Sequence, residues 1–475
     1  MSEETPVTPD EPAEGGRVSR RKFLGGVAGA GLGGLAIAGI LAACGESEEQ
    51  GAAPPAPPAG EEPAPTTAPG QTAADTSEPI VIGSAYPTVN AATDAEQMER
   101  GSGLAIQEIN DAGGVAGRTI EHEIVDMNSF DAESITSGMN DIVSKEVDAV
   151  IFGYHNVFEP NDVLAAYGAP FLNASTSIAQ VTQLKSDPEK YKNIFQADPT
   201  EVPYGLGFPP FLEALVAAGS FSPASKTIYI IEGDIVYGQT ISQACQDAAP
   251  DAGWEIVGVD PVDTSGGTAP VADWTPFISK VKDSGAAVTF NTHWNPADHA
   301  AFMKAWAADP ADSFVYLQYG ASVPEFLEIA GDAAEGAVWA TVLGTMNDPV
   351  GLAFQERYQA MWDAPAGFSN AGTGYDEVYL LAHAWGITGD TRNFDANIAE
   401  LKRNIYRGVS GGYWFGSDDA NYCLAYPSEI PDSSLGNPHL FFQIQRDDSG
   451  NLAHTIIDPA PYIQAEYIKQ PWLSS

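Results

Sequence analysis

Basic residues are scarce in this chain of 475 residues, where 21 Lys and Arg stand against 64 Asp and Glu and give a formal net charge of −43 at pH 7. A surface with that excess of negative charge repels phosphate backbones, so the composition excludes nucleic acid as a partner. The acidity alone indicates a solvated exterior and not a cation-binding site. The length exceeds what one core usually holds and predicts two or more packed domains.

Cysteine is rarer still, because the chain has only Cys44, Cys245 and Cys423. Three scattered cysteines are too few for a disulfide scaffold or for a zinc site built on thiolates. Whether Cys245 and Cys423 form a disulfide stays open, since their separation along the sequence does not determine the distance between their Cα atoms.

Catalytic motifs are also missing. The metalloprotease pattern H-E-x-x-H and the phosphate-binding pattern G-x-x-x-x-G-K-[ST] do not occur, and we expect the G-x-S-x-G pattern of a serine-hydrolase nucleophile elbow to be missing as well. His293 and His299 are six residues apart, a spacing that suits neither two ligands on one helical face nor a usual zinc site. We therefore predict that the protein is not an enzyme and that it has no catalytic residue, no cofactor and no metal.

The N-terminal region contains "SRRKFLGGVAGAGLGGLAIAGILAAC" over Ser19–Cys44. Its Gly29, Gly31 and Gly34 spell G-x-G-x-x-G, but a dinucleotide site needs a strand before the glycines and a basic cluster stands there instead. A basic flank, an apolar middle and small residues before a cleavage site are typical of an export signal. We assign residues 1–43 to a signal peptide, with an uncleaved membrane anchor as the alternative.

Two short motifs refine this assignment. "SRRKFL" resembles a twin-arginine signal, and "LAAC" resembles the lipobox of bacterial lipoproteins, in which Cys44 would become the lipidated N-terminus. Residues 44–78 are rich in Pro and Ala and poor in apolar side chains, which predicts a disordered linker. The body of the protein is therefore expected to be exported and lipid-anchored to the outer face of the cytoplasmic membrane.

From Ile80 onward, apolar runs alternate with helical segments. "IVIGSAY", "TIEHEIVD", "VDAVIFG", "APFLN", "KTIYIIEGD", "WEIVGVD", "GAAVTFN", "SFVYLQYG" and "GAVWATV" read as strands, and helices separate most of them. This alternation predicts an α/β protein with parallel sheets and more material than one doubly wound sheet needs. Prolines in "FQADPTEVPYGLGFPP" suggest the first crossing between two lobes. Helices at 349–361 and 375–386 suggest that the chain returns to the first lobe. "GGYWFG" and "LFFQIQ" read as terminal strands.

These residues resemble the type I periplasmic binding proteins, in particular the branched-chain amino acid, amide and urea class that serves ABC importers. The resemblance lies in "ERGSGLAIQEINDAGGVAGRTIEHEIVD", "AAYGAPFLNASTS", "YIIEGDIVYGQTISQACQDAAPDAGWEIVG", "PEFLEIAGDAAEGAVWAT" and "GTGYDEVYLLAHAW". It implies two doubly wound parallel-sheet lobes joined by a three-strand hinge. Residues 79–198 and about 345–408 would form lobe 1, and residues 199–344 and about 409–475 would form lobe 2.

The resemblance also implies a function. The protein would capture a small polar solute between its lobes, such as a branched-chain amino acid, an amide, urea or a related carboxylate, and deliver it to the permease and ATPase subunits of an ABC importer. The alternative is a sensory subunit that passes its closed state to a signalling partner. The chain shows no second membrane-spanning run and no output domain, which favours transport.

The family's ligand contacts carry over to loops after strands. In the first lobe, "FLNASTS" matches the loop whose backbone N–H and hydroxyl groups hold a ligand carboxylate or amide, which points to Ser175, Thr176 and Ser177. "YHNVFEP" replaces the family's usual residues after "VDAVIFG" and points to Tyr154 and Asn156, with His155 between them. One residue is missing near "FLNASTS" relative to the family, so this assignment can slip by one position.

In the second lobe the resemblance points to Tyr237, His293, Trp294, Gln318 and Tyr319. Amino acid binders of this class commonly place an acid in the loop that here reads Gln318, Tyr319 and Gly320. A buried ammonium without an anion costs several kcal/mol, on the order of the desolvation penalty of a charge. The sequence therefore favours amides, urea-like solutes or carboxylates over α-amino acids, unless Asp234, Glu232 or Asp376 supplies the acid.

Overall fold

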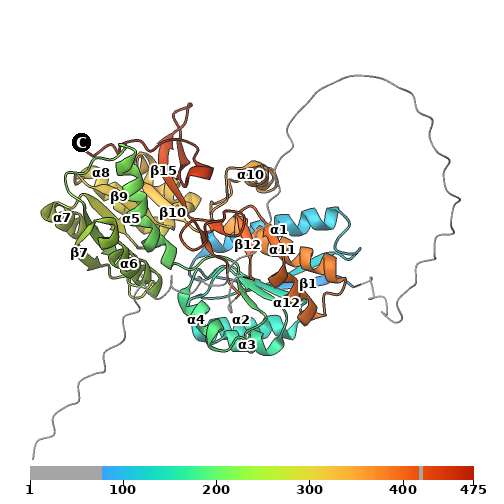
Figure 1. Cartoon of the computed structure of the whole chain (residues 1–475). Helices are drawn as coiled ribbons and strands as arrows, with labels where there is room; N and C mark the ends of the chain where they lie inside the picture. Colours follow the sequence, from blue (N-terminus) through green and yellow to red (C-terminus); the bar gives the residue numbers. More distant parts are fainter. Residues whose placement is uncertain (1–77, 417–420, 475) are drawn as a thin grey trace, which may run out of the picture. The chain divides into compact units, whose positions relative to one another are not determined.

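The computed structural model describes residues 78–416 and 421–474, which are coloured in Figure 1. The predicted signal peptide, its cleavage site, Cys44 and the predicted linker lie outside these described residues, apart from Glu78. In the part of the chain that is described, no helix is both long and apolar enough to cross a bilayer.

The first sheet has five parallel strands in the order β2-β1-β3-β4-β5. The strands are β1 (Ile80–Tyr86), β2 (Ile120–Asp126), β3 (Ala149–Phe152), β4 (Phe171–Asn173) and β5 (Ile194–Gln196). Helices α1 (Ala92–Asp111), α2 (Ala132–Ser144), α3 (Asn161–Tyr167) and α4 (Ile178–Ser186) connect them in turn. Every residue of β3, β4 and β5 is buried, as expected for parallel strands that helices cover on both faces.

The second sheet has seven strands in the order β16-β15-β10-β9-β8-β6-β7. They are β6 (Thr227–Glu232), β7 (Glu255–Pro261), β8 (Val288–Asn291), β9 (Phe314–Gln318), β10 (Val338–Thr341), β15 (Leu440–Arg446) and β16 (Leu452–Asp458). The associated helices are α5 (Val202–Ala217), α6 (Val236–Ala248), α7 (Thr275–Ser284), α8 (Pro296–Ala308) and α9 (Pro324–Ala330). Strands β6 to β10 are parallel, whereas β15 and β16 form an antiparallel hairpin on the edge of β10, visible in red in Figure 1.

The remaining helices return to the first sheet. They are α10 (Pro349–Trp362), α11 (Asn370–Thr388) and α12 (Phe394–Arg403), and α11 packs along α1. Two small sheets follow, one of β11 (Ile405–Arg407) with β12 (Gly412–Trp414) and one of β13 (Ala425–Tyr426) with β14 (Asn437–Pro438). The predicted helices at 349–361 and 375–386 thus lie within α10 and α11.

The chain passes between the two sheets three times, at 197–201, at 342–348 and directly before β15. The proline-rich stretch expected at the first passage is for the most part helical, because Pro203, Pro209 and Pro210 lie in α5. Pro203 is in the first turn, where a missing N–H costs no helical hydrogen bond. The spacing of the prolines alone did not show whether this stretch is a connection between the lobes or a helix with proline in its first turn.

Residues after 408 divide between the two sheets. The sequence prediction assigned 409–475 to the second lobe, but Val409, Tyr413, Phe415 and Cys423 belong to the core around the first sheet. Phe415 packs edge-on against Phe195 of β5, with ring centroids 5.0 Å apart. Among the described residues after 408, only β15 and β16 join the second sheet. The sequence prediction missed this division because short apolar strands do not reveal by themselves which sheet they extend.

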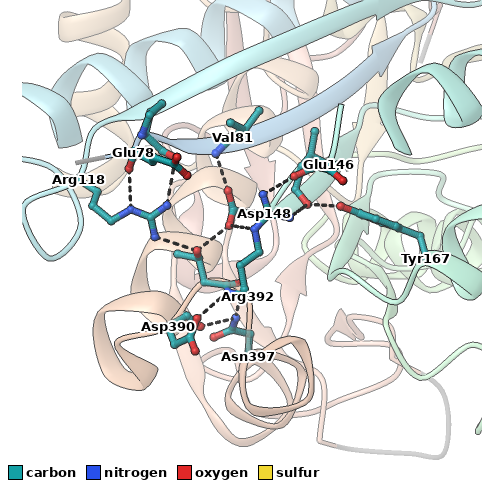
Figure 2. Close-up of polar contacts among 12 residues, drawn as sticks. Glu78, Val81, Arg118, Glu146, Asp148, Tyr167, Asp390, Arg392 and Asn397 are labelled. Atoms are coloured by element: carbon teal, nitrogen blue, oxygen red, sulfur yellow. Dashed lines mark hydrogen bonds and ion pairs between the residues drawn. The ribbon is translucent and has the colours of Figure 1, made fainter. Parts of the chain in front are cut away.

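A buried carboxylate ties the C-terminal helices to the start of the first sheet (Figure 2). Asp148 accepts hydrogen bonds from the Val81 backbone N–H at 2.8 Å and the Thr391 hydroxyl at 2.6 Å. Its carboxylate also lies 2.8 Å from Nε of Arg392. Arg118 donates to the Thr391 hydroxyl at 3.0 Å and so extends the network. Residues far apart in the sequence thereby hold the α11–α12 connection against β1.

The two described cysteines do not form a disulfide. Cys245 and Cys423 are both free and both fully buried, Cys245 in a core of the second sheet and Cys423 in the core of the first. This observation resolves the question that the sequence left open.

Candidate ligand site

A pocket lies where strands of both sheets end, and we call it the central pocket. It holds about 490 Å³ of empty space, including the part open to solvent. Its lining residues are Phe130, Tyr154, Asn156, Ala174, Ser175, Thr176, Ile235, Tyr237, Trp294, Tyr319, Leu343 and Asn370. Most of them follow the carboxyl ends of β2, β3, β4, β6, β8 and β9, the position at which open α/β sheets bind ligands.

Five aromatic rings form most of the pocket wall: Phe130, Tyr154, Tyr237, Trp294 and Tyr319. Phe130 follows a strand of the first sheet and Trp294 a strand of the second, and their ring centroids are 6.0 Å apart. The two sheets therefore meet through aromatic contact at this point. No Asp, Glu, Lys or Arg is among the residues that line the central pocket.

The structure brings together seven of the ten residues predicted from the sequence. They are Tyr154, Asn156, Ser175, Thr176, Tyr237, Trp294 and Tyr319. Their contact with a ligand stays a prediction. Ser177 lies one residue further along and lines a larger neighbouring cavity.

His293 and Gln318 do not line the pocket. The His293 imidazole is buried and its Nε2 lies 2.8 Å from Oδ2 of Asp298 in α8. Gln318 accepts a hydrogen bond from the Tyr316 hydroxyl at 2.7 Å and donates one to the Tyr237 hydroxyl at 2.9 Å. Gln318, the last residue of β9, therefore does not face the pocket itself but positions the Tyr237 ring through this hydrogen bond.

The loop after β4 uses its backbone donors internally. Ser175 donates its N–H to Oδ1 of Asn173 at 3.2 Å, Thr176 to Oδ1 of Asp198 at 3.3 Å, and Ser177 to Oε1 of Gln196 at 3.2 Å. The resemblance implied that these N–H groups hold the ligand's carboxylate or amide. In the structure each of them already has an acceptor from the protein.

Two pocket residues have left-handed backbone conformations. Thr176 has φ of +44° and Tyr319 has φ of +37°. Such angles are uncommon for any residue other than glycine and are costly for a β-branched side chain. The Thr176 hydroxyl donates to Oδ2 of Asp198, so one carboxylate accepts both donors of this residue and holds its backbone.

A buried acid lies behind the wall. Asp94, in the first turn of α1, accepts a hydrogen bond from the Tyr154 hydroxyl at 3.0 Å, and its other oxygen has no partner among the described residues. Burial raises the pKa of Asp94 to about 6. Tyr319 approaches from the second sheet, and its hydroxyl accepts a hydrogen bond from the Asn370 amide. Sequence reasoning missed Asp94, because an acid in the first turn of a helix is ordinary.

The larger neighbouring cavity, which we call the outer cavity, holds about 1,350 Å³ including the part open to solvent. It shares Phe130, Ser175 and Tyr237 with the central pocket, among others, and adds carboxylates. The acidic residues among its lining are Glu159, Glu201 and Asp234, and no Lys or Arg lines it. Hydrogen bonds from Thr264 and Gly266 lower the pKa of Asp234 against the opposing effect of burial, so it carries a negative charge.

Two nitrogen-bearing side chains complete the site. Nε1 of Trp294 is buried and has no hydrogen-bond partner among the described residues. His155 is buried with Nδ1 3.3 Å from the Ser175 hydroxyl and Nε2 2.9 Å from Oδ1 of Asn161. Burial lowers the pKa of His155 to about 4, so the imidazole is neutral near pH 7 and positions Ser175 without adding a charge.

One sequence motif needs correction. Gly408–Gly412 reads G-V-S-G-G and does have the G-x-S-x-G spacing, contrary to our expectation that no such pattern is present. A nucleophile elbow requires an exposed serine on a turn from a strand to a helix. Ser410 is instead fully buried in the connection between two strands, β11 and β12. Among residues 78–416 and 421–474, no group of three His, Cys, Asp or Glu side chains is placed to hold a metal.

Residues 79–425 match the family model of the periplasmic binding proteins. The chain belongs to this family. Such proteins bind small solutes outside the cytoplasmic membrane for delivery to permeases and are not enzymes. The prediction of a type I periplasmic binding protein built on parallel sheets is confirmed.

Relatives of this periplasmic binding protein are named for amino acid binding or for ABC transport. The leucine-, isoleucine-, valine-, threonine- and alanine-binding protein of Pseudomonas aeruginosa is 26% identical over 351 residues, 72% of this chain and 86% of that protein. A solved structure from Silicibacter pomeroyi, named for a branched-chain amino acid ABC transporter, is 34% identical with a TM-score of 0.76, covering 83% of this chain and 100% of that chain.

A more distant structure shares the fold. It is the solute-binding protein of an ABC transporter from Rhodopseudomonas palustris BisB5, in complex with 3,4-dihydroxybenzoic acid. It is 19% identical with a TM-score of 0.62, and the match covers 82% of this chain and 98% of that chain. These names do not favour the sensory alternative.

Proposed function

We propose that this protein is the extracytoplasmic substrate-binding subunit of an ABC importer and that it holds its solute in the central pocket. The observation that carries the proposal is the position of the pocket, at the strand ends of both sheets, with walls from each. A solute there would contact both halves of the protein at once. Its binding energy would therefore favour the state in which they are together, which is the state a permease can recognise.

The candidate ligands are small polar solutes, among them the classes that the sequence predicted: a branched-chain amino acid, an amide, urea or a related carboxylate. The Pseudomonas relative is named for leucine, isoleucine, valine, threonine and alanine. The Rhodopseudomonas structure contains 3,4-dihydroxybenzoic acid. Compact apolar bodies with one or two polar groups suit a wall of rings with few hydrogen-bonding groups.

The protein is exported and tethered by lipid on Cys44. This part of the proposal rests on the basic cluster, the apolar run and the "LAAC" motif of the N-terminal region. The test is the distribution of protein between membrane and soluble fractions of the native host. Cys44→Ala should leave the protein uncleaved and unlipidated, and a Cys44→Ala protein with the mass of lipidated wild type would overturn it.

Thermal unfolding tests the binding function. A ligand present at a hundred times its Kd stabilises the native state by about 2.7 kcal/mol, so a panel of branched-chain amino acids, amides, urea, aromatic acids and ammonium compounds should include at least one solute that raises Tm. If no solute raises Tm and none is detected by calorimetry at millimolar concentration, the proposed function is wrong.

A further inference from the structure

We infer that the ligand is an alkylated ammonium cation that carries one hydrogen-bond acceptor, and that the aromatic wall of the central pocket holds its charged end. This inference rests on the proposed function, because it assumes that the central pocket is where the solute binds. Three independent features of the pocket lead to it: the composition of its wall, the state of its hydrogen-bond donors and the sign of the charges around it.

The aromatic wall of the central pocket suits a cation that has no N–H groups. Five rings line the pocket, and Phe130 and Trp294 approach from opposite sheets. Each ring face attracts a cation by about 0.5–2 kcal/mol, and Trp attracts most strongly. A primary ammonium also needs acceptors for its three N–H bonds, and the wall contains no carboxylate. A quaternary ammonium needs none, so it loses no hydrogen bond when it enters.

The donors that would hold an anion are occupied. The backbone N–H groups of Ser175, Thr176 and Ser177 all donate to side chains of the protein. The Thr176 hydroxyl donates to Asp198 as well. A carboxylate placed at this loop would face no free backbone donor and would lie close to the buried carboxyl group of Asp198. This arrangement disfavours an anionic ligand at the position where the family resemblance implied one.

One buried donor remains for the ligand's acceptor. Nε1 of Trp294 has no partner among the described residues although it is buried and its ring lines the pocket. A buried N–H without a partner costs about 1–3 kcal/mol, and a ligand oxygen that accepts from it recovers that cost. This donor suits a hydroxyl or carbonyl oxygen, and the Asn156 amide, which also lines the pocket, offers a second donor.

The charges around the site have one sign. Asp94 accepts from the Tyr154 hydroxyl behind the wall, and this bond makes the phenol ring a better partner for a cation. Glu159 and Asp234 line the outer cavity, and neither cavity is lined by Lys or Arg. A field of one sign in a cleft concentrates ions of the opposite sign and repels ions of the same sign. Cations are therefore favoured over anions in both cavities.

Choline and its carbon isostere 3,3-dimethylbutan-1-ol give the decisive comparison, because they differ only in the positive charge. We expect choline to raise the Tm of the full-length protein and to bind at least about tenfold more tightly than the isostere by calorimetry, which corresponds to about 1.4 kcal/mol. Equal affinities would overturn the inference. Binding of isoleucine or benzoate without binding of choline, tetramethylammonium or glycine betaine would overturn it and leave the proposed function standing. No binding of any solute would overturn both.

Variants test whether the aromatic wall causes the preference for choline over the isostere. Phe130→Leu removes one ring and should reduce the choline preference over the isostere severalfold, whereas Phe277→Leu makes the same change in α7, outside both cavities, and serves as the control. Trp294→Phe keeps a ring but removes the N–H, so it should weaken choline more than tetramethylammonium, which has no acceptor. A Phe130→Leu protein that retains the full preference would contradict the inference, provided that its unfolding midpoint in urea matches that of the control.

Discussion

The hydroxyl and the backbone N–H of Thr176 both donate to the carboxyl group of Asp198, which connects the loop after β4 to the first passage between the sheets. Thr176 has a left-handed backbone, and this pair of hydrogen bonds offsets part of its conformational cost. The pocket loop is therefore held by the connection that must bend if the two halves move, so the geometry of the loop depends on the state of that connection.

Replacement of Asp198 tests this support. Asp198→Ala leaves two donors of Thr176 without an acceptor in a buried place, whereas Asp198→Asn keeps one acceptor oxygen. An unsatisfied buried donor costs about 1–3 kcal/mol, so we expect the Ala variant to be less stable than the Asn variant by about that amount in urea unfolding. Equal stabilities of the two variants would show that the carboxyl group does not hold the loop.

The stability of the protein should depend on pH through Glu201. Burial raises the pKa of this side chain to about 7 from its usual value of 4.5. The folded state keeps the proton at pH values where the unfolded chain has released it, so folding is disfavoured progressively as the pH rises from about 4.5 to about 7. Glu201→Gln carries no charge and should gain stability relative to wild type across this window, by at most about 3 kcal/mol.

Urea unfolding at pH 5 and at pH 8 measures the Glu201 effect, and the difference between variant and wild type should grow with pH. Glu189→Gln, at an exposed position, is the matched control and should follow the wild-type curve at both pH values. A Glu201→Gln difference that stays constant or shrinks with pH would contradict the assignment.

The network around Asp148 should contribute to stability far from the pocket (Figure 2). Asp148→Asn weakens its contacts with Thr391 and with Arg392 while it leaves an acceptor for the Val81 N–H. We expect a loss of about 1–3 kcal/mol in the free energy of unfolding. Asp395→Asn breaks an exposed pair with Lys192 and should change nothing measurable. Similar losses in both variants would argue against a special role of the buried Asp148 side chain.

A hydrogen bond between the two halves should contribute to ligand affinity. The Thr93 hydroxyl in α1 donates to Oε2 of Glu325 in α9 at 3.0 Å. Thr93→Val removes this bond from the closed state and should weaken ligand binding about two- to tenfold, since a hydrogen bond contributes about 0.5–1.5 kcal/mol. Thr136→Val is the control, because its hydroxyl bonds only within α2. Unchanged affinity of Thr93→Val would mean that this contact does not stabilise closure.

The two buried thiols should be inert in the folded protein. Burial raises the pKa of both Cys245 and Cys423, which lowers the thiolate fraction, and neither side chain is exposed. Peptide mass spectrometry after iodoacetamide treatment should find both thiols unmodified in native buffer and modified in urea. Rapid native labelling, or a peptide that joins the two without reductant, would contradict the observed packing.

Strand and helix alternation predicted the parallel strands of both sheets because each βα unit carries its own pattern of buried and exposed residues. The family resemblance pointed to the loops that line the pocket, in agreement with the rule that ligands bind beyond the carboxyl ends of parallel strands. The order of residues within a loop does not by itself show which side chains face the pocket. Gln318 and Tyr319 are neighbours, but only Tyr319 faces the pocket, and its left-handed φ is not visible in the sequence.

Other residues of the site carry no signal in the sequence that distinguishes them from residues elsewhere in the chain. Phe130 follows β2 in a short loop that shows no motif, and Asn370 begins a helix. Asp94 is one of many acids in an acidic chain, and only its burial beside Tyr154 distinguishes it. Contacts between segments that lie far apart in the sequence decide such roles, and the order of the residues alone does not contain those contacts.

The three passages between the sheets also constrain how the protein is made. The core of the first sheet extends from Ile80 to Cys423, and the second sheet is finished only by β16 at Asp458. Neither half has all its strands and packing partners until a ribosome has synthesised nearly the entire chain. Both halves must therefore remain incomplete until these late segments are made and then mature almost together, which leaves the buried strands of the earlier segments without their packing partners in the meantime.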